Sequence, residues 1–303
     1  MPKNWSNATG PMKKYNVIIL AGGENEDWCN QYGYNRKAFL PINGEPMLGR
    51  VIKAYRRSQY VDKIVVVGSR ELDQLAAMKY VHKRVPEGGS FLQNLLHGIL
   101  YVKAALYKFA FRHNGYLISF CDAAYLNTEI IDKTIANLDR HNPGLVLHYV
   151  HKDTLAKAGF PVENRSYMPV AGGKYTGSNI YYVRYFRGLL RVLRDIVILR
   201  SYRKDPVKIL EHIGCKDKNY NGIAEVLSRK LKTKCKIFVS PFAEMGVDVD
   251  KPIDYELAKI ELDEARQTGR KQMEREMRNI YNELSRLGVR INTHDGRQTH
   301  RET

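Results

Sequence analysis

The chain has 303 residues, of which 44% are hydrophobic, and it carries 49 Lys and Arg against 32 Asp and Glu, for a formal net charge of +17. The length allows one large domain or two small ones, and the apolar content excludes a chain that is disordered throughout. The positive charge favours polyanionic ligands such as nucleotides, phosphorylated metabolites, nucleic acid or an anionic membrane surface, although an ordinary basic protein has the same balance.

The cysteines and the start of the chain carry no sign of export. The four cysteines form no Cys-x-x-Cys pair, so we expect neither a zinc site nor a disulfide framework, and we expect a reducing compartment. The first 13 residues lack the apolar core of a signal peptide, and no segment has the apolar length of a membrane span. These features predict a cytoplasmic protein that begins with a flexible arm over residues 1–13.

The first predicted element is a buried strand over residues 17–20, an apolar and mostly β-branched run that ends at a pair of glycines. Paired glycines let the backbone approach a ligand closely and present N–H groups to an anion. A lysine, Lys37, follows a polar loop, Asn43-Gly44 predicts a turn, and the next segment predicts an amphipathic helix over residues 46–57. This arrangement suits a triphosphate, although it contains neither GxGxxG nor a P-loop.

The residues LAGG at 20–23, followed by KAFLPINGEPML at 37–48, resemble the nucleotidyltransferase family of the GT-A-like fold. That family includes sugar-phosphate nucleotidylyltransferases, the molybdenum-cofactor guanylyltransferase and the MobA-like NTP transferases. The resemblance implies an α/β protein, a three-layer α/β/α domain with a mostly parallel central sheet over residues 14–262. The nucleotide-binding residues that it implies in this stretch are Leu20, Ala21, Gly22, Gly23 and Lys37. Many members carry an arginine soon after the glycines, whereas residues 24–27 here read Glu-Asn-Glu-Asp.

A second glycine loop follows a predicted strand over residues 63–68 and a short predicted helix over residues 71–78. It precedes an amphipathic helix, and free N–H groups at a helix N-terminus favour anions. In the family that the resemblance indicates, this loop recognises the base and positions the ribose. The nucleotide-binding residues implied here are Gly88, Gly89, Ser90 and Asn94. Ser90 also suits a helix N-cap, and we expect it to serve both purposes.

A third predicted strand, over residues 115–122, ends in the carboxylate of Asp122. Ligands of parallel α/β sheets bind outside the carboxyl ends of the strands, where the first glycine pair is also expected. The resemblance implies that Asp122 holds Mg²⁺ on the phosphates of the NTP, in keeping with the preference of hard cations for carboxylates. The alternative is an Asp that caps the helix predicted near Thr128, but Asp122 lies several residues too early and Thr128 can cap by itself.

A third glycine loop, over residues 172–179, lies between predicted strands at residues 144–150 and 180–183. It lies where the family places its acceptor-binding loop. The acceptor-binding residues implied here are Lys174, Gly177 and Asn179. Lys174 suits an acceptor phosphate and Asn179 a polar acceptor, and each is equally compatible with an ordinary loop residue.

The segment over residues 184–208 predicts a basic helix with arginines on one face and a broad apolar side. A solvated basic face is the plainer interpretation of this pattern. The sharper interpretation is peripheral contact with anionic lipid head groups or with a polyphosphorylated acceptor.

Two carboxylates in GVDVDKPIDYELA, residues 246–258, form the last candidate site. In an extended chain Asp248 and Asp250 point to the same face, where two like charges need a cation between or beside them. The segment resembles the Asp-x-Asp-x-Pro-x-Asp end of the family's catalytic domain, in which an Asp completes the metal site. We assign this role first to Asp250 and second to Asp248. Asp254 is expected in the first turn of the next helix, where the helix dipole stabilises it.

The rest of the chain predicts a helical extension over residues 263–290 and a polar, disordered tail over residues 291–303. The helical extension carries a stripe of Met, Ile and Leu at helical spacing, which is expected to pack on the catalytic domain or on a second subunit.

The predicted activity is Mg²⁺-dependent transfer of an NMP from an NTP to a phosphorylated small-molecule acceptor, with release of pyrophosphate. Lys37, Asp122 and Asp250 are the predicted catalytic residues. The first rival is a glycosyltransferase, because Asp248-Val249-Asp250 is formally an Asp-x-Asp motif. The second rival is a non-catalytic nucleotide- or RNA-binding protein, suggested by the charge, although nucleic acid is not the expected partner.

Overall fold

The computed structural model describes residues 13–23, 26–105, 115–138, 143–163, 165–170, 172–184, 208, 211–212, 214–215, 219–265 and 268. The chain divides into two compact units, Met1–Ala258 and Lys259–Thr303, and the sheet described below lies in the first. The predicted arm before Lys13, most of the basic stretch over residues 184–208 and the tail over residues 291–303 lie outside the described residues. So does most of the helical extension over residues 263–290.

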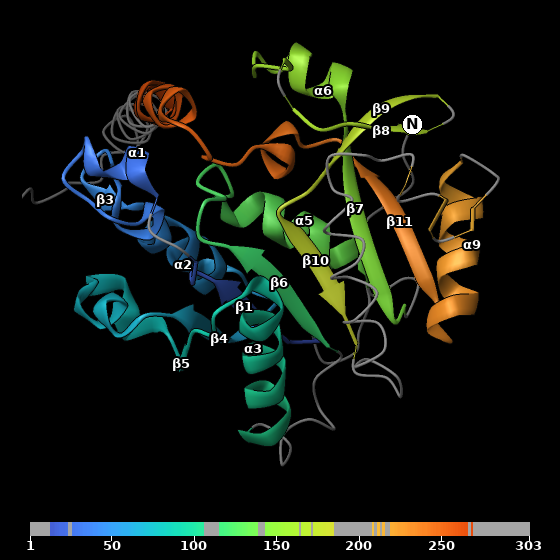
Figure 1. The fold of residues 1–303 in the computed structure, drawn as a ribbon, viewed down its shortest axis with the longest axis horizontal. Helices are drawn as coiled ribbons and strands as arrows, with labels where there is room; N and C mark the ends of the chain where they lie inside the picture. The colour runs from blue at the N-terminus through green and yellow to red at the C-terminus, as the bar shows by residue number, and fades with distance from the viewer. Residues whose placement is uncertain are drawn as a thin grey trace, which may run out of the picture. The chain divides into compact units, whose positions relative to one another are not determined.

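Within the described residues one mixed sheet of nine strands organises the first unit. Its strand order is β5-β4-β1-β6-β10-β7-β9-β8, with β11 paired to β7 (Figure 1). The strands are β1 (Tyr15–Leu20), β4 (Val61–Gly68), β5 (Lys83–Pro86), β6 (Tyr116–Phe120), β7 (Leu145–His151), β8 (Met168–Val170), β9 (Gly173–Gly177), β10 (Ile180–Val183) and β11 (Cys235–Ser240).

The core of this sheet is parallel, because β1 pairs in parallel with both β4 and β6, and β4 pairs in parallel with β5. All six residues of β1 are buried, as expected for a central strand covered on both faces. Strand β10 lies antiparallel between β6 and β7, and β11 runs parallel to β7. The prediction of an α/β sheet with a mostly parallel core is confirmed.

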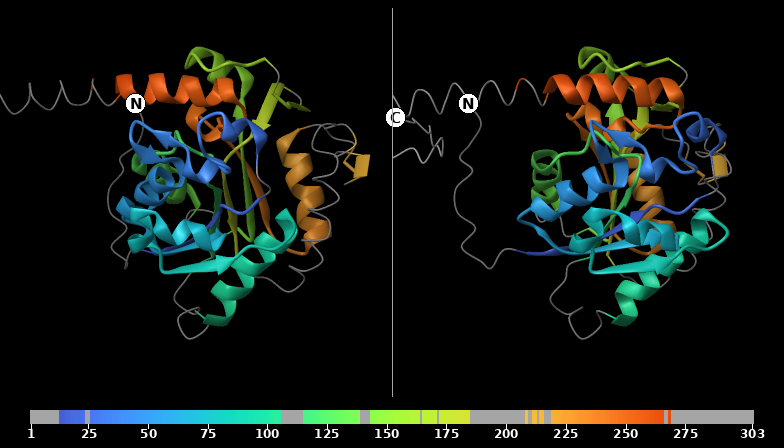
Figure 2. Two further views of the ribbon diagram at one scale, coloured as in Figure 1. Left: turned by 60° about the vertical axis from the view of Figure 1, so that its left-hand side comes forward. Right: turned by 90° about the vertical axis from the view of Figure 1, so that its left-hand side faces the viewer.

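Helices cover both faces of the sheet and make the fold three-layered. One face carries α3 (Phe91–Ala105) and α9 (Tyr220–Leu231), and the other carries α2 (Met47–Arg57) and α5 (Thr128–Leu138) (Figures 1 and 2). Gly98 lets α3 approach the sheet closely, since a Cβ there would lie 2.6 Å from Ile18 Cγ2. No helix among the described residues is long and apolar enough to cross a membrane.

A small hairpin precedes α2 and follows the predicted turn. Its strands are β2 (Pro41–Ile42) and β3 (Glu45–Pro46). Asn43 and Gly44 both have positive φ, at 54° and 79°, which is the backbone that a two-residue type I′ hairpin turn requires and that Asn-Gly favours. The Asn-Gly turn is therefore confirmed.

Several short or irregular elements differ from the sequence prediction. The helix predicted over residues 71–78 is two 3₁₀ segments, Arg70–Gln74 and Ala76–Tyr80. The glycine loop predicted over residues 172–179 is mostly strand β9, which pairs with β7 and β8. Strands β5, β8 and β11 and helices α6 (Lys152–Lys157) and α9 were not predicted. The glycines of this segment favoured a loop in the prediction. Pairing with neighbouring strands outweighs that weak local preference and makes the segment a strand.

Candidate active site

The carboxyl ends of β1 and β6 lie side by side and form the floor of the site. Leu20 and Phe120, the last residues of these strands, are register partners, and the Cys121 amide donates to the Leu20 carbonyl at 3.1 Å. Gly22 and Asp122 each follow two residues later. The parallel register therefore brings the first glycine loop and the predicted carboxylate to the same edge of the sheet.

Lys37 reaches this edge from a short 3₁₀ helix, Lys37–Phe39, which is anchored by the buried side chains of Ala38 and Phe39. Its ammonium contacts three carboxylates that come from distant parts of the chain. The Nζ atom lies 2.6 Å from Asp250 Oδ1, 2.9 Å from Asp122 Oδ2 and 3.2 Å from Glu26 Oε1. The structure thus brings together Lys37, Asp122 and Asp250.

The environment of this cluster raises the pKa of both Lys37 and Asp122. Burial disfavours the ammonium of Lys37, but Asp122 and Asp250 outweigh that effect and raise the pKa of Lys37 above its usual range. Burial and the charge of Asp250 raise the pKa of Asp122, and the nearby ammonium of Lys37 opposes this rise. Lys37 is therefore a permanent cation at neutral pH, surrounded by more negative charge than it can neutralise.

The segment that carries Asp250 is tied to the strand end by its backbone. The Val249 amide donates to the Asp122 carbonyl at 3.1 Å. The carboxylate of Asp254 accepts from the amides of Asp250 and Lys251 at 3.2 and 3.0 Å, at the start of a helix over residues 252–265. This is the carboxylate half of a capping box, and it places Asp254 in the first turn of that helix, as expected.

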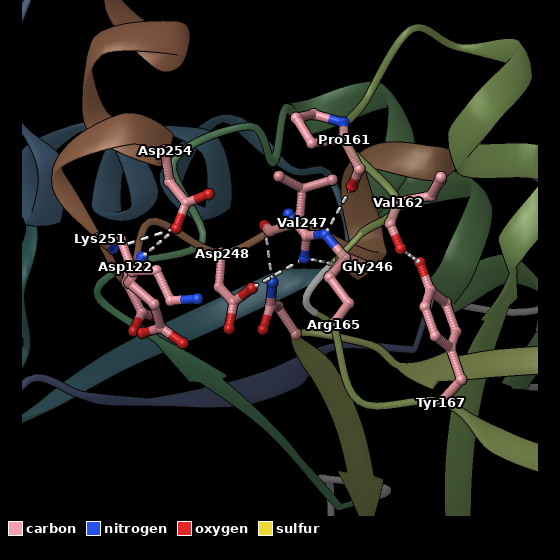
Figure 3. A network of polar contacts seen from close by, with 12 residues as sticks. Asp122, Pro161, Val162, Arg165, Tyr167, Gly246, Val247, Asp248, Lys251 and Asp254 are labelled. Atoms are coloured by element: carbon pink, nitrogen blue, oxygen red, sulfur yellow. Dashed lines mark hydrogen bonds and ion pairs between the residues drawn. The ribbon is translucent and has the colours of Figure 1, made fainter.

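Asp248 turns to a different cation. Its Oδ1 accepts from Arg165 Nη1 at 3.2 Å, and the same guanidinium donates to the carbonyls of Gly246 at 3.1 Å and Pro161 at 3.0 Å. Figure 3 shows Asp248 between Asp122 and Arg165. Burial, together with the charges of Asp250 and Asp122, raises the pKa of Asp248 to about 7.

The residue types of this cluster suit a divalent cation. Asp122 Oδ2 and Asp250 Oδ1 contact the same Lys37 ammonium, at 2.9 and 2.6 Å, so the two carboxylates lie close to each other. Mg²⁺ prefers such hard oxygen donors and binds them at about 2.1 Å. Among the residues that the structure describes, no group of three or more His, Cys, Asp or Glu is arranged to hold a metal ion, and Lys37 lies between the two carboxylates instead. The donor chemistry of the pair nevertheless fits Mg²⁺.

The first glycine loop meets a carboxylate that the sequence reading did not single out. The Gly23 amide donates to Glu87 Oε2 at 3.1 Å, and Arg36 Nη1 donates to both oxygens of Glu87, at 2.8 and 2.9 Å. A Cβ on Gly22 would lie 2.7 Å from Glu87 Oε2 and 2.8 Å from Asn94 Nδ2. Gly22 is thus required because side chains lie directly on its backbone.

The second glycine loop is held to helix α3 by two side chains. Ser90 Oγ accepts from the Gln93 amide at 3.2 Å, so its N-cap role is confirmed. Asn94 is 3% exposed, and its Oδ1 accepts from the Gly88 amide at 2.6 Å. The loop therefore has a fixed shape beside Gly22, whereas nucleotide contact by residues 88–90 stays a prediction.

The three acceptor-site candidates lie along β9 and just beyond it. Lys174 is exposed near the start of β9 and faces Pro169 in the register, while Gly177 ends the strand opposite Tyr149. Asn179 is buried beyond the strand, and its Nδ2 donates to the Val247 carbonyl at 2.9 Å. Asn179 thereby supports the loop that carries Asp248 and Asp250, and its Oδ1 is the polar atom that remains for an acceptor.

Four charged residues of this region were missed by sequence reasoning: Glu26, Arg36, Glu87 and Arg165. Arg36 could have been found, because it directly precedes Lys37, and Glu87 directly precedes the second glycine loop. Glu26 belongs to the acidic sequence stretch over residues 24–27. Arg165 lies 83 positions from its partner Asp248, and no local pattern marks it.

Three solved structures resemble this chain. A hypothetical transferase from Thermus thermophilus has 25% sequence identity and a TM-score of 0.61, covering 80% of this chain and 99% of its own. The 4-diphosphocytidyl-2C-methyl-D-erythritol synthase from Anaerococcus prevotii (10% identity, TM-score 0.50) covers 84% and 100%. A CMP:2-keto-3-deoxy-manno-octonic acid synthetase complexed with CTP (13% identity, TM-score 0.51) covers 84% and 99%. The last two share the fold alone. Comparison with curated proteins returned no match.

The family itself is shown by the sequence. Residues 17–213 match the family model described as the MobA-like NTP transferase domain, which is more than half of the chain and includes both LAGG and KAFLPINGEPML. The match ends before Asp248 and Asp250, so these two residues are placed at the site by the fold. The chain therefore belongs to the MobA-like NTP transferase domain family of nucleotidyltransferases.

Proposed function

We propose that this protein transfers an NMP group from an NTP to a phosphorylated small-molecule acceptor, releases pyrophosphate and depends on Mg²⁺. One observation carries the proposal. Lys37, Asp122 and Asp250 converge at the carboxyl ends of β1 and β6, beside the glycine loop. A cation flanked by carboxylates at the rim of a nucleotidyltransferase sheet is suited to neutralise a polyphosphate and to share a metal with it.

In this proposal the nucleotide lies across the two glycine loops. The residues assigned to it are Leu20, Ala21, Gly22, Gly23, Lys37, Gly88, Gly89, Ser90 and Asn94. The main-chain N–H groups of the first loop face the phosphates, and the second loop faces the base. The close packing of Gly22 against Glu87 and Asn94 supports this placement, because it joins the two loops into one surface.

Asp122 and Asp250 are the proposed metal ligands, with Asp248 as the second choice because Arg165 already pairs with it. When bound, Mg²⁺ supplies positive charge to the phosphate oxygens. As the NTP enters, Lys37 leaves the two carboxylates and donates to a phosphate. The ammonium stays charged throughout, because the negative phosphate replaces the two carboxylates as its neighbour.

The reaction is a substitution at the α-phosphorus. An anionic phosphate oxygen of the acceptor forms the new P–O bond, and the bond from the α-phosphorus to the oxygen that bridges to the β-phosphorus breaks. The electron pair of that bond leaves with pyrophosphate. No general base is required, because the attacking oxygen is already ionised and has no proton to lose. Lys174, Gly177 and Asn179 are proposed for the acceptor side, where the exposed Lys174 is suited to a phosphate.

The first test is a thermal shift with each of the four NTPs and Mg²⁺, followed by a pyrophosphate-release assay across phosphorylated acceptors. We expect one NTP to raise the melting temperature and one acceptor class to support release. A glycosyltransferase would instead release free NDP from a nucleotide-sugar. A non-catalytic RNA binder would show RNA affinity that falls steeply with salt and no NTP turnover.

A further inference from the structure

Glu87 holds an unusual pair of donors for a surface carboxylate. It accepts from the main-chain amide of Gly23 and from Arg36, although the three residues belong to separate loops. Its side chain and that of Arg36 are only 21% and 20% exposed. A main-chain N–H of a glycine loop together with a guanidinium is a donor set that also binds phosphate oxygens.

An ordinary structural ion pair explains these contacts less well. Arg36 Nε is buried and has no hydrogen-bond partner among the described residues, so Glu87 leaves one donor of the guanidinium unused. The carboxylate also lies against Gly22 so closely that a Cβ there would be 2.7 Å from Oε2. An ion pair between Arg36 and Glu87 that only stabilised the fold would not require Glu87 to accept from the Gly23 amide as well.

We propose that the Gly23 amide and Arg36 form a phosphate seat of the NTP site, and that Glu87 is an internal carboxylate that fills this seat until the triphosphate displaces it. The inference rests on the proposed function. It gives Arg36 the role of a second phosphate-binding cation, next in sequence to Lys37.

Competition for the seat has a direct consequence for affinity. Glu87 must leave both donors before a phosphate can bind, so part of the binding free energy of the NTP is spent on its displacement. A carboxylate carries one negative charge, and a terminal phosphate carries more, so a polyphosphate has the advantage over it. The seat therefore selects for ligands of high negative charge.

The test measures binding of inorganic tripolyphosphate, without metal, by titration calorimetry. Glu87→Gln keeps the shape of the side chain but removes its charge, and we expect it to bind tripolyphosphate roughly tenfold more tightly than the wild-type protein. Arg36→Gln should bind roughly tenfold more weakly. Glu129→Gln, an exposed residue of α5, makes the same change in net charge and should bind like the wild type.

Unchanged or weaker binding by Glu87→Gln would overturn the inference, because it would make Glu87 a support for Arg36 and not a competitor. If Glu87→Gln does not fold, Glu87→Asp keeps the charge, shortens its reach and should still bind several-fold more tightly. Measuring pyrophosphate release from Mg-NTP by the same proteins distinguishes failure of the proposed nucleotidyl transfer from failure of the proposed displacement of Glu87. Tighter tripolyphosphate binding with no release under any NTP contradicts the proposed function alone, and release with weaker binding by Glu87→Gln contradicts this inference alone.

Discussion

Two groups of polar residues in and around the sheet are held in different ways. Lys37, Glu26, Asp122 and Asp250 form what we call the side-chain group, because charged side chains contact each other there. The main-chain group bonds to backbone atoms. It consists of Arg165, His148, Asn179 and Asp254.

The side-chain group can rearrange without a change in the backbone, whereas the main-chain group holds the backbone in place. Loss of a side chain that bonds to backbone carbonyls or amides lowers the stability of the fold, since a buried backbone group without a partner costs free energy. Carboxylates that share one ammonium can exchange it for another cation without moving the chain. We therefore expect substitutions in the side-chain group to remove activity and substitutions in the main-chain group to reduce stability.

The largest expected effect is on turnover in the side-chain group. Lys37→Ala and Asp122→Ala should each lower the rate of pyrophosphate release by at least about a hundredfold, the usual scale for a lost electrostatic stabiliser. Near-normal release by both variants would contradict the assignment. Glu211→Ala changes an exposed carboxylate outside this group and serves as the matched control for lost charge.

His148 tests the main-chain group through pH. It is 4% exposed, and its Nδ1 donates to the Ile180 carbonyl at 3.1 Å. Burial lowers its pKa from 6.5 to about 4, so the folded state prefers the neutral ring. This stability is fully present above pH 6.5 and is lost as the pH falls from 6.5 towards 4, by about 3 kcal/mol.

The measurement is urea unfolding across this pH range, compared with His148→Asn, whose amide can donate in place of Nδ1. The free energy of unfolding of the variant should lack this component, so the difference between the two proteins should shrink as the pH falls. Parallel curves for the two proteins would show that His148 does not titrate as a buried neutral ring.

Arg165 should matter for stability more than for chemistry. Arg165→Ala removes donors from the carbonyls of Gly246 and Pro161 and leaves Asp248 without its cation. We expect the free energy of unfolding to fall by about 2 kcal/mol, with turnover of the folded protein reduced by less than about tenfold. Arg70→Ala, at the exposed start of the 3₁₀ segment Arg70–Gln74, is the control. A hundredfold loss of turnover without loss of stability would show that Arg165 acts in the reaction and contradict its assignment to the main-chain group.

The smallest expected effect belongs to Asp254. Its carboxylate accepts from the amides of Asp250 and Lys251 at the start of a helix. Asp254→Ala should reduce the free energy of unfolding by about 1 kcal/mol, as for other helix N-terminal caps. Thermal unfolding measures this change. An effect several times larger would mean that the loop of Asp250 depends on this one side chain.

The sequence predicted the parts of the fold that depend on strong local patterns. The apolar runs that became β1, β4, β6, β7 and β10 were all identified, because buried central strands read as continuous hydrophobic segments. Strand β11 was missed, since its interior residues are partly buried or exposed. Its pairing with β7 is a long-range property that no local window contains.

The site was predicted where a motif or a strand end marks it. Lys37, Asp122 and Asp250 could be named because the motif and the parallel strands bring them to one edge. Arg165 could not be named, because its contact with Asp248 depends on how two separate loops meet. Asn179 was predicted as an acceptor contact, and its bond to the Val247 carbonyl depends on a loop almost 70 positions away.

The position of β10 between β6 and β7 sets the order in which a nascent chain can assemble. Strands β1, β4, β5 and β6 are complete once residue 120 has left the ribosome, and they can pair with each other at once. Strand β7 is synthesised earlier than β10, and among the described strands it is β10 that connects it to β6. We therefore expect translation to produce a preformed N-terminal half that waits for residues 180–183, and Lys37 to meet Asp250 only near the end of synthesis.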